Sequence, residues 1–115
     1  MFFKWAKSEG LNDATLIKAA KEIDKGLINA YLGGNLLKKR IARKGEGKSG
    51  GFRTMVVFQK GHRTIFVYGF PKNQRDNINA QEEKALKKLA QNLLDAPESE
   101  LKEMIVNGDL YEVTS

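Results

Sequence analysis

The sequence predicts an α+β fold, in which the middle of the chain forms a small antiparallel sheet and the two ends form helices. Apolar residues recur at helical spacing over residues 16–27 and 86–94. Residues 36–70 are instead rich in β-branched and aromatic residues and contain the hairpin signal Lys60-Gly61. A chain of 115 residues, 41% of them hydrophobic, suits a single domain over residues 1–115.

The first quarter of the chain is predicted to be helical. A short apolar turn begins at Trp5, and either Asn12 or Asp13 can cap the helix that follows, because a short side-chain oxygen accepts from free amides of the first turn. The apolar face of this helix contains Leu16, Ile17, Ala20, Ile23 and Leu27. Gly26 is the expected stop, and residues 32–35 are expected to form a turn.

The middle of the chain predicts three strands. Residues 36–42 form the first, and a flexible glycine-rich loop over residues 44–51 follows it. Residues 52–59 form the second strand, in which residues 55–58 are apolar on both faces, as is typical of a central strand. The third strand is expected at residues 64–70.

The last third of the chain predicts two further helices and a short strand. Asn79 and Glu82 have the spacing of a capping box. The stripe that follows consists of Leu86, Leu89, Ala90, Leu93 and Leu94. Pro97 suits the first turn of a last helix, because its missing amide would be unpaired there in any case. Residues 110–113 are expected to add an edge strand.

Positive charge is concentrated in the middle of the chain. The net charge is +6, and residues 38–75 hold eleven of the twenty basic residues but only one acidic residue, Glu46. A concentrated positive field attracts a polyanion, and the release of counterions supplies affinity. A solvated basic surface is the alternative. Because the charges crowd onto two strands and a glycine-rich loop, a phosphate-binding face is favoured.

Several classes of protein are disfavoured by what the sequence lacks. There is no cysteine, and the one histidine, His62, falls at a predicted hairpin tip, so no metal site and no cofactor are expected. No run of about 18 apolar residues is present, so no membrane partner is expected. The start of the chain lacks the pattern of a signal peptide. We therefore expect a cytoplasmic protein.

The candidate site is a cluster of basic residues on the predicted strands. Because side chains alternate along a strand, Lys38 and Arg40 point the same way, and Arg53 can lie beside them on the next strand. Lys72 follows the third strand, and Arg75 lies in the loop beyond it. Guanidinium groups on rigid strands can bind a phosphodiester and stabilise the extra charge of its transition state.

Three segments of the chain resemble the RelE-like toxins of bacterial type II toxin–antitoxin systems, in particular their HigB-like branch. These segments are residues 37–43, the Gly-Lys-Ser-Gly-Gly-Phe-Arg stretch at 47–53, and residues 68–73, which include Gly-Phe-Pro-Lys-Asn. The likeness extends from about Trp5 to Val113. The resemblance implies a RelE-like fold, with the N-terminal and C-terminal helices packed on one face of the sheet and a concave RNA-binding surface on the other.

The resemblance also implies an activity and partners. Toxins of this kind cut messenger RNA on the ribosome without a metal and are neutralised by an antitoxin, here expected to be a small helix-turn-helix protein. The chain departs from the family pattern in three ways: an N-terminal strand, a late tyrosine and a C-terminal histidine are not evident. Tyr68 is a candidate substitute for the tyrosine.

The expected reaction is attack of a 2′-hydroxyl on the adjacent phosphate. Arg53 is assigned to transition-state charge, and Lys38 and Arg40 to the flanking phosphates. Lys38 or Lys72 is a candidate for proton transfer, so that the general base stays open between them. The predicted catalytic residues are therefore Lys38, Arg40, Arg53 and Lys72. The predicted RNA-binding residues are Lys39, Arg43, Lys44, Lys48, Tyr68 and Arg75. The alternatives are a ParE-like inhibitor of DNA gyrase, which shares the fold, and a non-catalytic RNA-binding module.

Overall fold

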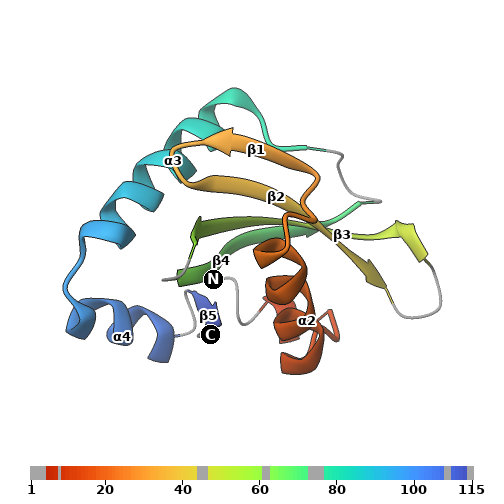
Figure 1. Ribbon diagram of the computed structural model, residues 1–115, viewed down its shortest axis with the longest axis horizontal. Helices are drawn as coiled ribbons and strands as arrows, with labels where there is room; N and C mark the ends of the chain where they lie inside the picture. The colour runs from red at the N-terminus through yellow and green to blue at the C-terminus, as the bar shows by residue number, and fades with distance from the viewer. Residues whose placement is uncertain are drawn as a thin grey trace.

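The protein is a mixed α/β structure built on one five-stranded antiparallel sheet (Figure 1). The computed structural model describes residues 5–7, 9–43, 47–60, 63–72, 77–107 and 110–113, with only the backbone described for 43 and 47–50. The elements are α2 (Asp13–Asp24), β1 (Ala30–Gly33), β2 (Leu36–Arg43), β3 (Gly47–Gln59), β4 (Arg63–Pro71), α3 (Ala80–Asp95), α4 (Glu98–Val106) and β5 (Tyr111–Val113). The strand order is β1-β2-β3-β4-β5. None of the helices described is long and apolar enough to cross a membrane.

Both predicted N-terminal helix caps are confirmed. Asn12 caps α2, because its Oδ1 accepts a 2.9 Å hydrogen bond from the amide of Thr15. Asn79 and Glu82 form a reciprocal capping box at the start of α3. Pro97 differs from its prediction by one position, since it is the N-cap of α4 and not part of its first turn.

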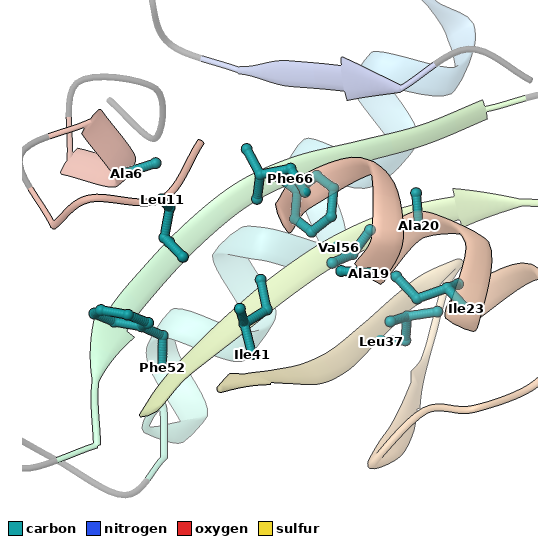
Figure 2. Close-up of a cluster of buried hydrophobic side chains, with 11 residues drawn as sticks. Ala6, Leu11, Ala19, Ala20, Ile23, Leu37, Ile41, Phe52, Val56 and Phe66 are labelled. Atoms are coloured by element: carbon teal, nitrogen blue, oxygen red, sulfur yellow. The ribbon is translucent and has the colours of Figure 1, made fainter. Parts of the chain in front are cut away.

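The sheet has a hydrophobic core on each face. On one face, α2 packs on alternate side chains of β2, β3 and β4 (Figure 2). On the other face, α3 and α4 pack on the intervening residues, such as Met55 and Val57. The prediction that all helices pack on one face is therefore wrong. The physical reason lies in β3, because Val56 faces α2 while Met55 and Val57 face α3 and α4. All three residues are fully buried, so both faces of the sheet must be covered by helices.

Two strand boundaries also differ from those predicted. Residues 30–33 form strand β1, so only residues 34 and 35 of the predicted turn at 32–35 form a turn. Asn35 adopts a φ of 66° there. Strand β3 begins at Gly47 and not at residue 52, because Gly47 pairs with Arg43 of β2. Part of the predicted glycine-rich loop therefore belongs to the sheet. The edge strand predicted at residues 110–113 is confirmed as β5.

A bulge in β4 changes which side chains face α3. Met55 pairs with Tyr68, whereas Val56 pairs with Phe66, so Val67 is an extra residue on β4. As a result, Val67 and Tyr68 both contribute to the core beneath α3 and α4. Without the bulge, strict alternation would place these two neighbours on opposite faces.

Trp5 holds the N-terminal turn of the chain against β4, on the face of the sheet that α2 covers. The indole of Trp5 lies over Gly69 so closely that a Cβ added to this glycine would lie 2.4 Å from the ring. The same indole packs edge-on against Phe52 of β3, with 5.6 Å between ring centroids. Gly69 is therefore the residue that lets the first turn of the chain close over the sheet.

Tyr111 ties β5 to the start of α2. Its hydroxyl donates a 2.9 Å hydrogen bond to Asp13 Oδ1, and burial together with this carboxylate raises the pKa of Tyr111 to about 12. The raised pKa favours the neutral phenol in the folded state. The stability that this supplies is therefore fully present below pH 10.0 and is lost as pH rises through about 12.

We expect a spectrophotometric titration of the folded protein to show Tyr111 ionising at a higher pH than an ordinary phenol. Tyr111→Phe should remove that late step. Asp13→Asn should move the step to lower pH without abolishing the shift, because burial remains the largest cause. A titration curve that Tyr111→Phe leaves unchanged would contradict the assignment.

Candidate active site

Strand register brings the predicted basic residues together on the face covered by α3 and α4. Arg40 of β2 lies directly opposite Arg53 of β3, which in turn lies opposite Phe70 of β4. In the next row, Lys38 lies opposite Met55, and Met55 lies opposite Tyr68. Residues opposite one another in adjacent strands share a face of the sheet. The predicted common orientation of Lys38 and Arg40, with Arg53 beside them, is confirmed.

The two arginines differ in their exposure to solvent. Arg40 is exposed, whereas Arg53 is only 6% exposed and interacts with other parts of the protein. Like charges directly opposite one another in a sheet are destabilising. An anion placed between the two guanidinium groups would turn this repulsion into attraction, so the pair is suited to a phosphate.

Two residues at the N-terminal end of α3 bond the two ends of the row formed by Lys38, Met55 and Tyr68. Lys38 Nζ donates a 3.3 Å hydrogen bond to Asn77 Oδ1, just before the helix. The Tyr68 hydroxyl donates a 3.2 Å hydrogen bond to Glu82 Oε2, in the first turn of the helix. No local sequence pattern marks Asn77 as a site residue, and Glu82 is predicted only as part of a helix cap. Their contacts with the sheet depend on where α3 lies, which no local sequence signal gives.

Lys72 lies at the edge of this cluster. Its backbone N–H donates a 3.0 Å hydrogen bond to the carbonyl of Gly51, two residues before Arg53, and its side chain is half-buried. The end of β4 is thus held beside the part of β3 that carries the buried arginine.

Comparison with known protein families identifies the chain. Residues 1–113 match the family described as the RelE toxin of the RelE / RelB toxin–antitoxin system. The chain belongs to the RelE toxin family. No curated protein and no solved structure matches it. The resemblance found in the sequence is therefore confirmed at the level of the family, and this chain has the role of a toxin in a toxin–antitoxin system.

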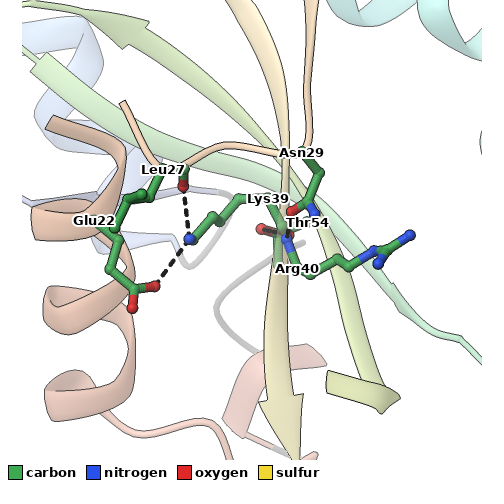
Figure 3. A network of polar contacts seen from close by, with 6 residues as sticks. All are labelled: Glu22, Leu27, Asn29, Lys39, Arg40 and Thr54. Atoms are coloured by element: carbon green, nitrogen blue, oxygen red, sulfur yellow. Dashed lines mark hydrogen bonds and ion pairs between the residues drawn. The ribbon is translucent and has the colours of Figure 1, made fainter. Parts of the chain in front are cut away.

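One predicted RNA-binding residue of this RelE toxin lies on the wrong face for that role. Lys39 points toward α2, away from Arg40, and is 4% exposed (Figure 3). Its Nζ lies 2.9 Å from Glu22 Oε1 and donates a 2.7 Å hydrogen bond to the carbonyl of Leu27. Lys39 therefore ties the end of α2 to the sheet, and its assignment to RNA binding is corrected. The alternation that pairs Lys38 with Arg40 also places Lys39 on the opposite face.

The remaining predicted site residues of the toxin are only partly described. Tyr68 lies on the same face as Lys38, as noted above, and is half-buried. Arg43 and Lys48 belong to β2 and β3, with only their backbones described. Lys44 and Arg75, like the hairpin residue His62, lie outside the described residues.

Proposed function

We propose that this RelE toxin is a ribosome-dependent endoribonuclease that cuts messenger RNA and so inhibits translation. The observation that carries the proposal is the pair formed by Arg40 and Arg53 across β2 and β3, with Lys38 on the same face. Two guanidinium groups held on rigid strands suit a phosphodiester, and the family supplies the toxin role. We further propose that the toxin belongs to the HigB-like branch and acts in the cytoplasm.

The proposed reaction needs a phosphate clamp, a base and an acid. The 2′-oxygen of one nucleotide attacks its own 3′-phosphate, and the bond to the 5′-oxygen of the next nucleotide breaks. Arg53 stabilises the charge that develops on the phosphate, because a buried guanidinium acts strongly where water is excluded. Arg40 and Lys38 hold the flanking phosphates, and Lys72 or Lys38 donates a proton to the leaving 5′-oxygen.

The proposal extends to the partners of the toxin. Arg43, Lys44, Lys48 and Arg75 would add electrostatic attraction to ribosome-bound RNA, since they are basic residues in or next to the strands of the site. An acidic segment of the antitoxin, a small helix-turn-helix protein, would cover the basic face and gain specificity and association rate from complementary charge.

The test combines purified toxin with ribosomes programmed with an end-labelled messenger RNA. We expect cleavage that yields a 2′,3′-cyclic phosphate and a 5′-hydroxyl, and no cleavage at a position carrying a 2′-deoxyribose. Parallel reactions contain DNA gyrase with supercoiled DNA, or RNA alone at increasing salt. Breaks trapped on gyrase with intact messenger RNA would favour the ParE-like activity. Salt-sensitive RNA binding without either product would favour a non-catalytic module.

A further inference from the structure

The segment that joins α2 to β1, residues 25–29, is bonded to the backbone of β2 behind the candidate site. The N–H of Asn29 donates a 3.1 Å hydrogen bond to the carbonyl of Lys38. The side chain of Asn29 reaches two residues further along β2, because its Oδ1 accepts a 2.6 Å hydrogen bond from the N–H of Arg40 (Figure 3). Asn29 therefore holds β2 at both of its predicted catalytic residues.

The bond to Asn29 also shows how Arg40 faces Arg53. In an antiparallel sheet, the N–H and C=O groups of one residue point toward the same neighbouring strand. The N–H of Arg40 points to Asn29, on the side of β1, and so it points away from β3. Arg40 and Arg53 are therefore a non-hydrogen-bonded pair, in which the Cα atoms lie about 4.5 Å apart and the side chains are closer than in a hydrogen-bonded pair. This closer pairing favours the binding of one phosphodiester by both side chains.

The arginine pair needs support from outside the strand pairing. Two like charges directly opposite one another repel, which favours a displacement of Arg40 away from Arg53 when no anion lies between them. Strand β1 does not oppose this displacement at Arg40, because its register with β2 ends at the pair of Ala30 and Lys38. The side chain of Asn29 takes the place of a strand partner at the next position, the N–H of Arg40.

The buried Lys39 anchors the same segment from the opposite face of the sheet. Its Nζ donates a 2.7 Å hydrogen bond to the carbonyl of Leu27, two residues before Asn29. The same Nζ lies 2.9 Å from Glu22 Oε1, near the end of α2. The carbonyl of Lys39 accepts a 2.9 Å hydrogen bond from the buried hydroxyl of Thr54 on β3. Lys39 therefore ties the segment that carries Asn29 to both β2 and β3.

We propose that Asn29 is a positioning residue for RNA cleavage, which sets the guanidinium of Arg40 against that of Arg53 so that both meet one phosphodiester. The proposal rests on the proposed function, because it concerns how that phosphodiester is held. Asn29 acts through Arg40 and does not itself touch the substrate. Its effect is expected on the rate, because a misplacement of about 1 Å can cost about 100-fold in rate.

The decisive variant is Asn29→Ala, which removes the acceptor of the Arg40 amide and keeps the backbone bond to Lys38. We expect the single-turnover rate of messenger RNA cleavage at saturating ribosomes to fall about 10-fold. Asn29→Asp should restore this rate to within about twofold of wild type, because a carboxylate oxygen also accepts from an amide. Hydrogen exchange of the Arg40 amide, followed by NMR, should be at least about 10-fold faster in Asn29→Ala and slow again in Asn29→Asp.

A change of Arg40 separates positioning from a general loss of stability. In the Arg40→Ala background the guanidinium is absent, so Asn29→Ala should lower the rate no further. The matched control is Asn12→Ala, because Asn12 also offers its Oδ1 to a backbone amide, that of Thr15, at the other end of α2. This control should lower the melting temperature, since it removes a helix cap. Its cleavage rate, measured at a temperature where it is folded, should equal that of wild type.

Three results would overturn the positioning role while wild-type cleavage stands. These are an unchanged rate in Asn29→Ala, an equal rate loss in the Arg40→Ala background, and a rate loss that Asn29→Asp does not restore. Unchanged exchange of the Arg40 amide in Asn29→Ala would show that the side chain does not hold β2, and would also overturn it. A wild-type protein that leaves messenger RNA intact would overturn the proposed function and, with it, the role of Asn29 in cleavage.

Discussion

Replacement of Arg53 by alanine is expected to abolish growth arrest on expression and to lower messenger RNA cleavage in vitro by about 100-fold to 1000-fold, the usual effect of removing one donor to transition-state charge. Arg53 is suited to this role because it lies on the central strand, is nearly buried, and faces Arg40 across the sheet. The alanine variant also removes a large buried side chain, so the effect on the fold is judged from a replacement that keeps most of the side-chain volume. Arg53→Met therefore serves as the volume-matched variant, and thermal unfolding followed by circular dichroism measures its stability.

Arg63→Met is the matched control for the change at Arg53. Arg63 is also a strand arginine, but it lies at the far end of β4, opposite Gln59 and near Glu112. This variant should remain toxic. Wild-type toxicity in Arg53→Met would show that the site lies elsewhere, whereas a large fall in its melting temperature would show that the arginine is structural.

Gly69→Ala is expected to lower the stability of the fold strongly. The new Cβ would meet the ring of Trp5 at 2.4 Å, so the indole and the first turn of the chain must move. Overpacking of this kind costs about 1–3 kcal/mol. In a domain of this size each kcal/mol lowers the melting temperature by roughly 4 °C. Because Trp5 is the only tryptophan, its fluorescence should shift to longer wavelength as the ring enters water.

Trp5→Ala combined with Gly69→Ala gives the control for this clash. Trp5→Ala alone loses the contact of the indole with Phe52. Once the indole ring is absent, Gly69→Ala should lower the stability little further, because the group that its Cβ would clash with is gone. If Gly69→Ala lowers the stability by the same amount with and without Trp5, strain elsewhere in β4 is the cause of the loss.

Features encoded by short-range patterns were predicted correctly from the sequence. The capping box of α3 depends on two residues three positions apart, and the shared face of Lys38 and Arg40 depends only on alternation along one strand. The position of Arg53 beside Arg40 followed from pairing consecutive strands. Each of these features is fixed within one element or one hairpin.

The errors concern features that depend on the whole assembly. The apolar residues at 55–58 already indicated that β3 is buried on both faces, and a sheet buried on both faces needs helices on both. Strand β1 was missed because it is four residues long and ends in Gly33, which has a positive φ. The contact between Glu82 and Tyr68 joins residues whose proximity is set by the packing of α3 and by the bulge at Val67, neither of which a local pattern encodes.

The order of the strands has a consequence for how the chain assembles. Strands β1 to β4 are neighbours in sequence as well as in the sheet, so their pairing closes only short loops. Strand β5 joins β4 only after both C-terminal helices, and its Tyr111 bonds Asp13 across 98 positions. We expect this closure to be the slowest step of folding, since contacts distant in sequence form late. A newly made chain would thus form its four-stranded meander before β5 can pair with β4 and before Tyr111 can bond Asp13.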